Sequence, residues 1–270
     1  MLPHMERPSL MATLKIAICV PVYGNPEAMY LQSLASMISC FYEANITDEN
    51  GVLYEKQIDT FVVSSSMLTE GRHRLAAEAL NWGADYMLWS DADHVFPADA
   101  LCRLWAHGKD IVGCNYARRS TPTAPTAAKG EAGDGTKGLL YTTQDKADAF
   151  ELEEVDHLGF GLCLMKMSVF DALQVQAEAE GKASFLPLFM FQPTEDHRTM
   201  IGEDVFFFRK CRDAGLKVWC DHALSWQVGH VAKQILTNAH ACVQQAKWDD
   251  RRAAVAQKYQ KRIDELEAAA

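Results

Sequence analysis

Two aspartates one residue apart, Asp91 and Asp93, follow the short apolar run 86–90. The run has the length and composition of a buried β-strand, and alternate residues of a strand point to the same side. Both carboxylates are therefore expected to face one point at the end of the strand. Because carboxylate oxygens are the ligands of hard divalent cations, the pair predicts a metal site. Acidic residues here can also serve only as caps of a following helix, and this alternative stays open.

The segments before Asp91 alternate between strand and helix patterns. Residues 14–21 are mostly apolar and 59–64 are rich in β-branched and aromatic residues, so both are predicted to be strands. Apolar residues recur at helical spacing in about 26–42 and about 69–82. This alternation is typical of right-handed βαβ units.

The same alternation continues after the aspartates. A helix is predicted for 98–107, and 110–116 reads as a fourth strand. Strands and helices at this spacing predict a parallel sheet, and such sheets bind ligands at the carboxyl ends of their strands. Asp91 and Asp93 are expected to lie at such an end.

The second half of the chain has a different pattern. Residues 120–137 are rich in Thr, Pro, Ala and Gly, which predicts a surface loop, either a lid or a plain insertion. We expect one catalytic domain over 14–231, with halves 14–119 and 138–231, a helical extension over 232–270, and a tag-like or disordered start over 1–13. The later elements are expected as antiparallel strands at 138–143 and 151–166, helices at 169–180 and 205–214, and a strand at 216–220.

Composition limits the classes of protein that fit. The chain has 270 residues, 49% of them hydrophobic, which is enough for a large core. No apolar run is long enough to span a membrane, and the start lacks a signal-peptide layout, so a cytoplasmic protein is expected. Eight scattered cysteines without a Cys-x-x-Cys pair indicate reduced, buried thiols. The net charge of -10 argues against a broad nucleic-acid surface.

Five short blocks in order carry a family resemblance. They are Val20–Gly24, Gly71–Leu75, Asp91–Asp93, Gly159–Leu162, and Gly202–Phe206 with the later Val228–His230. Over about 15–231 the chain resembles nucleotide-sugar-dependent glycosyltransferases of the GT-A fold, closest to family 2-like sequences of bacteria and phages. The resemblance implies an α/β, Rossmann-like fold with a mixed, mainly parallel sheet flanked by helices, followed by a helical tail.

The resemblance also implies a metal centre. Asp93 is expected to bind the ion directly, and Asp91 to contact the ribose or a metal-bound water. His230 resembles the third ligand, although an ordinary packed histidine stays an alternative. An imidazole among oxygen ligands favours Mn²⁺ over Mg²⁺. His94 is expected to point away from the aspartates and to be structural.

The Glu-Asp motif of the resemblance suggests Asp204 as general base, and a carboxylate suits deprotonation of an acceptor hydroxyl. Glu203 could exchange roles with it. The expected place of Asp204 at a helix N-terminus would stabilise its anion and so make it a weaker base. The acidic pair Glu195-Asp196 is a competitor, and its alternative is a solvated loop.

The remaining site predictions concern the donor. Arg72 matches an arginine that contacts nucleotide or phosphate, and Pro21 and Tyr23 match the turn that receives the nucleobase. Gly161 resembles the position where the backbone meets the donor sugar or the acceptor. A β-bulge glycine and a buried tyrosine at a strand end are the plain alternatives.

These observations predict a metal-dependent transfer from a nucleoside-diphosphate sugar, such as a UDP-sugar, to an acceptor hydroxyl, with inversion if Asp204 is the base. The expected acceptor is a saccharide or small molecule. A phage-type acceptor, a hydroxymethylated DNA base, is a further hypothesis, and the oligomeric state is open. The basic residues that could meet DNA are Arg118, Arg119, Lys247, Arg251, Arg252, Lys258 and Arg262. Solvated charges on a helix are the favoured interpretation of these residues. A metal-dependent phosphohydrolase or nucleotidyltransferase, or a non-catalytic nucleotide-sugar binder, are the other classes.

Overall fold

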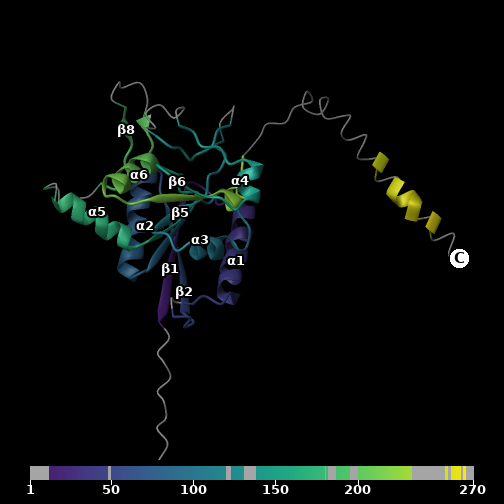
Figure 1. Ribbon diagram of the computed structural model, residues 1–270, viewed down its shortest axis with the longest axis horizontal. Helices are drawn as coiled ribbons and strands as arrows, with labels where there is room; N and C mark the ends of the chain where they lie inside the picture. Colours follow the sequence, from purple (N-terminus) through teal and green to yellow (C-terminus); the bar gives the residue numbers. More distant parts are fainter. Residues whose placement is uncertain are drawn as a thin grey trace, which may run out of the picture. The chain divides into compact units, whose positions relative to one another are not determined.

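The computed structural model describes most of the first 232 residues and part of the tail (Figure 1). The described ranges are 12–47, 50–119, 123–130, 138–179, 181, 187–194, 200–232, 253–254, 257–262 and 264–265. The chain divides into two compact units, 1–231 and 232–270, and the described residues of the second after 232 are helical. No helix among the described residues is long and apolar enough to cross a membrane.

A seven-stranded sheet with the order β2-β1-β3-β7-β5-β10-β6 forms the centre of the first unit. Its strands are β1 (Thr13–Val22), β2 (Glu55–Ser64), β3 (Tyr86–Ser90), β5 (Ile111–Gly113), β6 (Leu152–Val155), β7 (Leu162–Lys166) and β10 (Val218–Asp221). Neighbouring parallel pairs are β1 with β2, β1 with β3, and β5 with β10; β7 is antiparallel to β3 and β5, and β6 to β10. The prediction of a mixed, mainly parallel sheet is confirmed.

Seven helices among the described residues accompany the sheet. They are α1 (Ala28–Glu43), α2 (Leu68–Trp82), α3 (Ala100–Ala106), α4 (Gln144–Asp148), α5 (Ser168–Ala179), α6 (Glu203–Asp213) and α7 (His222–Ser225). The helices α1, α2, α3, α5 and α6 lie close to the predicted ranges, since their apolar residues recur at helical spacing. The short helices α4 and α7 were not predicted.

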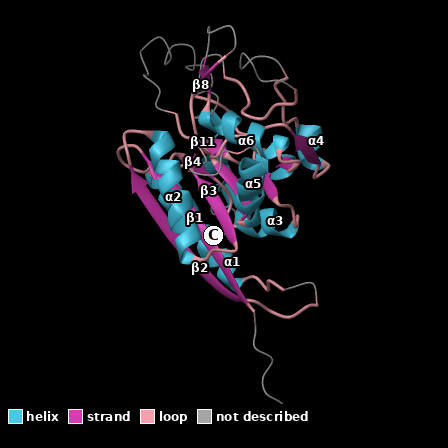
Figure 2. Cartoon of the chain, turned by 90° about the vertical axis from the view of Figure 1, so that its left-hand side faces the viewer, coloured by secondary structure: helices cyan, strands magenta, loops and turns pink. Residues whose placement is uncertain are grey.

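The strand alternation produces two hydrophobic layers, one on each face of the sheet. In β1, Ile16 and Ile18 pack with residues of α1 and α3, whereas Ala17 and Cys19 pack with residues of α2, α5 and α6. Figure 1 shows α1 and α3 on one side of the strands and α2 and α6 on the other, and Figure 2 shows β1, β2 and β3 side by side. Because both faces are covered, the central strands read as continuous apolar runs.

The prediction of a strand at 138–143 is wrong, because a buried asparagine holds this part of the chain in another conformation. Asn115 follows β5, and its Nδ2 donates to the backbone oxygen of Leu140 at 2.8 Å. Its Oδ1 accepts hydrogen bonds from the backbone nitrogens of Thr126 and Ala127, each at 3.0 Å. The side chain thereby occupies backbone groups that a strand would have paired.

Two small strand pairs lie outside the main sheet. The strands β8 (Gln192–Pro193) and β9 (Met200–Ile201) are antiparallel to each other. The strand β4 (His94–Val95) pairs with β11 (Gly229–His230), with His94 opposite His230. The nitrogen of Val231 then donates to the oxygen of Asp93 at 2.8 Å. This second pair brings the end of the first unit to the end of β3.

Seven cysteines lie among the described residues, and all seven are free thiols. Five of them are buried: Cys19, Cys114, Cys163, Cys211 and Cys220. This agrees with the expectation of buried thiols without disulfides.

Candidate functional site

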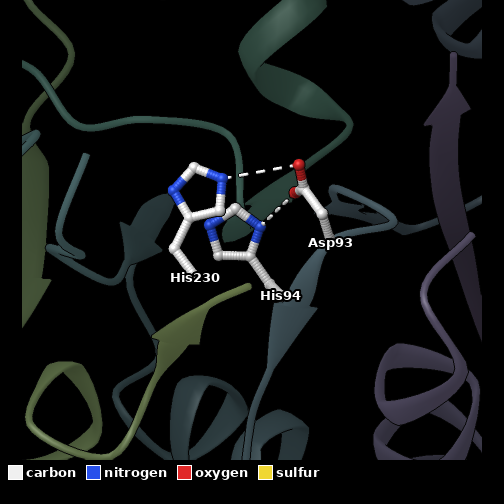
Figure 3. A group of neighbouring side chains, drawn as sticks. All are labelled: Asp93, His94 and His230. Atoms are coloured by element: carbon white, nitrogen blue, oxygen red, sulfur yellow. Dashed lines mark ion pairs between the residues drawn. The ribbon is translucent and has the colours of Figure 1, made fainter. Parts of the chain in front are cut away.

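Asp93 lies at the centre of a polar cluster just after β3. Its Oδ2 is 2.9 Å from Nη1 of Arg119 and 3.4 Å from Nε2 of His230, and its Oδ1 is 3.0 Å from Nδ1 of His94. Figure 3 shows both imidazole rings turned toward this carboxylate. Asp93, His94 and His230 form a group that could hold a metal ion, with one ligand atom from each and all three atoms within 4.8 Å of one another.

The surroundings of Asp93 stabilise its ionised form. Burial alone would raise the pKa of Asp93, but the contacts with His230 and His94 outweigh it and hold the pKa well below its usual range. The group is therefore a carboxylate at any working pH, which is the state that binds a cation.

The prediction that His94 points away from the aspartates is wrong. Its ring stacks on that of His230, with centroids 4.3 Å apart and planes 18° from parallel. Strand β3 ends at Ser90, so residues 91–93 form a turn, and β4 then runs along β11 with His94 opposite His230. Because of this turn, the side chain of His94 lies on the opposite side from the one that a continuous strand would have given it.

Asp91 does not join this group among the described residues. Its Oδ1 accepts a hydrogen bond from Nη2 of Arg72 at 3.2 Å. The expectation that both aspartates face one point rested on a strand continuing through them, and the strand stops one residue earlier. Asp91 and Asp93 therefore belong to two neighbouring polar groups.

Arg72 is the second unexpected feature of the site. It is buried, and its Nε donates to Oε1 of Glu203 at 3.2 Å, across 131 residues of sequence. The guanidinium lies over the rings of Trp89 and Phe160, at 5.3 and 4.7 Å from their centroids. It was predicted to contact the nucleotide, but in this structure it links two carboxylates of the protein.

Asp204 follows Glu203 in the first turn of α6, and its Oδ1 accepts from the nitrogen of Val205 at 2.7 Å. Burial and the charge of Glu203 raise its pKa to about 7, against the opposing effects of the Val205 nitrogen, Arg72 and Arg118. A carboxyl group with this pKa is a much better base than an ordinary aspartate.

The other predicted site residues differ in exposure. Tyr23, beyond β1, is 85% exposed, so its ring is free to meet a ligand, and Pro21 near it is half-buried. Gly161 is buried against the protein itself: a Cβ there would lie 2.5 Å from Nε2 of His94 and 2.6 Å from Cε1 of Tyr116. Its lack of a side chain is explained by this packing.

Several predictions lie outside the described residues. They are the competitor pair Glu195-Asp196, most of the lid candidate (120–122 and 131–137), and the basic residues Lys247, Arg251 and Arg252 of the tail.

A second group that could hold a metal is formed by Glu151, Glu153 and His222. Glu153 already pairs with Lys129 and Lys146, each at 2.5 Å, and with Nε2 of His222 at 2.9 Å. Two ammonium groups neutralise this carboxylate, so the group has the composition of a structural ion-pair network.

No family model and no curated protein matches the chain. Among solved structures it is similar to A197 from STIV, with 12% identity and a TM-score of 0.48, covering 83% of this chain and 97% of that one. The catalytic domain of Drosophila beta1,4galactosyltransferase 7, in complex with xylobiose, has 16% identity and a TM-score of 0.45, covering 84% and 77%. GalNAc-T7 with UDP, GalNAc and Mn²⁺ has 11% identity and a TM-score of 0.47; 83% of this chain spans only 45% of that one. At this distance, any conclusion about activity must come from the residues of the chain itself.

Proposed function

We propose that the protein is a metal-dependent glycosyltransferase of the GT-A type, which moves a sugar from a nucleoside-diphosphate sugar to an acceptor hydroxyl. The observation that carries the proposal is the pair of bonds made by Arg72, to Asp91 after β3 and to Glu203 at the start of α6. Asp93 lies two residues after Asp91, and Asp204 directly follows Glu203, so these bonds hold the candidate metal ligand and the candidate base near the same end of the strands, where parallel sheets present ligand sites.

In this proposal Asp93 and His230 hold the divalent ion, for which the candidate is Mn²⁺ in preference to Mg²⁺. The residues fit such an ion, because a fully ionised carboxylate faces two imidazole nitrogens. When bound, the ion neutralises the pyrophosphate of the donor and the departing nucleoside diphosphate. Asp91, oriented by Arg72, faces the ribose, and the exposed Tyr23 beside Pro21 meets the nucleobase.

Asp204 is the proposed general base, with Glu203 as the neighbour that keeps its pKa high. It removes the proton from the acceptor hydroxyl as that oxygen bonds to the anomeric carbon. The bond from the anomeric carbon to the nucleoside diphosphate breaks on the opposite face, so the configuration inverts. A base of this type contributes about 10²–10⁴ in rate.

The proposed acceptor is a saccharide or another small hydroxyl compound. The net charge of -10 disfavours a large polyanion as acceptor. Of the arginines that could meet DNA, Arg119 is already paired with Asp93. A hydroxymethylated base therefore has less support than a saccharide.

Turnover in ¹⁸O-water tests the proposal against a phosphohydrolase. UDP- and GDP-sugars are incubated with Mn²⁺, with and without a panel of saccharides, and the products are analysed by mass spectrometry. We expect unlabelled nucleoside diphosphate, with ¹⁸O only in free sugar formed by hydrolysis. The label in phosphate, or no release of nucleoside diphosphate from any donor, would contradict the proposal.

The role of Asp204 is tested in the same assay. Asp204→Asn should lower release of nucleoside diphosphate by about 10²–10⁴. The matched control is Asp213→Asn at the other end of α6, where the side chain is 60% exposed, and it should keep the wild-type rate. Equal rates above background for wild type and Asp204→Asn would contradict the role of Asp204 as base, whereas no turnover by either protein would fit a non-catalytic binder.

A further inference from the structure

His94 is a buried histidine whose ring nitrogens have no partner with hydrogen-bond geometry among the described residues. The residue is 1% exposed, and neither Nδ1 nor Nε2 makes a hydrogen bond. Nδ1 lies 3.0 Å from Oδ1 of Asp93 but outside hydrogen-bond geometry. A buried polar atom without a hydrogen-bond partner is unfavourable, so in a native protein it calls for an explanation, such as a catalytic role, a bound water or a bound ion.

The neighbouring His230 is prepared to act as a ligand. Its Nδ1 lies 3.0 Å from the backbone oxygen of Ala117, and since a carbonyl can only accept, Nδ1 carries the proton. Nε2 is then the nitrogen that faces Oδ2 of Asp93, at 3.4 Å, and it can bind an ion once it gives up its own proton. A backbone carbonyl on the far nitrogen is the usual support of a metal-bound imidazole.

We propose that His94 is the third protein ligand of the divalent ion, which is held by two imidazoles and one carboxylate: Asp93, His94 and His230. This rests on the metal dependence of the proposed function and adds a direct ligand to Asp93 and His230, while Asp91 stays outside the group. One atom from each residue lies within 4.8 Å of the other two. Small side-chain shifts would bring the three atoms close enough to share one ion.

The backbone holds both rings in this arrangement. The β4–β11 pairing sets His94 opposite His230, and the rings stack at 4.3 Å. Behind His94, the missing side chain of Gly161 leaves room for the ring, which also packs edge-on against Tyr116 at 4.3 Å. The ring of His94 can therefore turn only slightly, and its Nδ1 faces Asp93.

Arg119 supplies the positive charge beside Asp93 in this structure. Its Nη1 is 2.9 Å from Oδ2, and its side chain is 53% exposed. The guanidinium occupies the side of the carboxylate that an ion would use, so it must leave when the ion binds. Because it is exposed, leaving it in water costs little. Arg119 is thus a competitor of the metal, and His94 a ligand.

Two imidazoles change which ion the site prefers. Mg²⁺ favours oxygen ligands and keeps several waters, whereas nitrogen ligands bind later first-row ions more tightly, in the order Mn²⁺ < Fe²⁺ < Co²⁺. The site should therefore bind Mn²⁺ and Co²⁺ and reject Mg²⁺. A site of carboxylates and one histidine would discriminate less.

Pulsed electron paramagnetic resonance of the full chain with Mn²⁺ alone tests the proposal without nucleotide or activity. We expect couplings from two distinct histidine nitrogens in wild type and from one in His94→Phe, which keeps a ring in the stack. The matched control is His157→Phe, a buried histidine outside the group, which should keep both couplings. Titration should show Mn²⁺ binding weakened at least about tenfold in His94→Phe.

Arg119→Ala should change the Mn²⁺ affinity in the opposite direction. Removing the competitor should tighten Mn²⁺ binding, whereas His94→Phe should weaken it. A misfolded variant would not bind more tightly. One nitrogen coupling in wild type, unchanged in His94→Phe, would overturn the role of His94 and leave the proposed function standing. Absence of any Mn²⁺ or Co²⁺ binding by wild type would overturn both.

Discussion

A single buried arginine connects the parts of the site. Arg72 lies between Asp91 and Glu203, and its third nitrogen, Nη1, is buried without a hydrogen-bond partner among the described residues. Two carboxylates and the aromatic faces of Trp89 and Phe160 compensate its charge. The arginine acts as a positioning residue, because it sets Asp91 and the first turn of α6 relative to each other.

Arg72→Met should destabilise the fold by about 3–5 kcal/mol, because two carboxylates lose the charge that compensates them. The free energy of unfolding, from urea denaturation, measures this. Arg74→Met is the matched control on the same helix: Arg74 is exposed, so the change should stay within about 0.5 kcal/mol. Equal effects of the two substitutions would show that the bonds of Arg72 contribute little.

The raised pKa of Asp204 predicts two opposite pH dependences. The folded protein keeps a proton on Asp204 up to about pH 7, whereas the unfolded chain releases it near pH 4. Between these values the native state binds more protons, so this group's contribution to stability falls as pH rises, by at most about 1.4 kcal/mol per pH unit. Transferase activity should rise over the same range, since only the carboxylate acts as a base.

Urea denaturation of wild type and Asp204→Asn from pH 4 to 8, with an activity profile of wild type, measures both. The stability of wild type relative to Asp204→Asn should decline with pH and level off above about 7. A constant difference would mean that Asp204 has an ordinary pKa and is ionised throughout.

At the scale of elements, the Gly159-Phe160-Gly161 turn before β7 packs behind the candidate metal-binding group of Asp93, His94 and His230. A Cβ on Gly161 would enter the space of His94 and Tyr116, and the nitrogen of Gly161 donates to the hydroxyl of Tyr116 at 3.2 Å. The nitrogen of Asp91 donates to the oxygen of Gly161, also at 3.2 Å. The turn therefore contacts both His94, which belongs to β4, and Asp91.

Gly161→Ala should cost about 1–3 kcal/mol of stability and weaken Mn²⁺ binding, because the new methyl group displaces the ring of His94. Gly71→Ala is the control: Gly71 lies inside α2, where the nearest atom to a Cβ is 3.7 Å away. It should stabilise the protein by about 0.5–1 kcal/mol. Thermal unfolding and Mn²⁺ titration measure both, and tolerance of Gly161→Ala without loss of metal affinity would contradict this role.

Local patterns predicted the elements well. The apolar runs of β1 and β3 and the helical spacing in α2 depend on neighbours within the segment, so the sequence shows them. It does not show which strand lies beside which: β7 inserts antiparallel between β3 and β5, a pairing that depends on the whole sheet. The side chain of Asn115, which replaces a predicted strand, is likewise a long-range effect.

The site was predicted only in part, because some of its contacts also depend on residues far apart in the sequence. Asp93 and His230 lie 3.4 Å apart, and their role as metal ligands, which the resemblance implied, stays a prediction. The position of His94 depends on the turn after β3 and on β11, which lies more than a hundred residues later, so the alternation rule placed it on the wrong side. A histidine directly after an aspartate was the only local signal. No local signal in the sequence indicated the ion pair of Arg72 with Glu203.

At the scale of the whole molecule, the sheet of the unit 1–231 has a hydrophobic layer on each face, and the candidate site lies just beyond the end of β3. Cores on either face fix the strands, and the strand ends fix Asp91 and Asp93. The net charge of -10 would repel an anionic donor, so binding of a nucleoside diphosphate needs a local positive charge. The proposed metal ion at Asp93 would provide this charge, which makes metal dependence the central claim.

Isothermal titration of UDP and GDP into the full chain, with and without Mn²⁺, tests that claim most directly. We predict binding of at least one nucleotide that requires Mn²⁺ and is lost in Asp93→Ala but kept in the exposed control Asp213→Ala. Nucleotide binding that is the same without Mn²⁺, or the same in Asp93→Ala, would contradict the account.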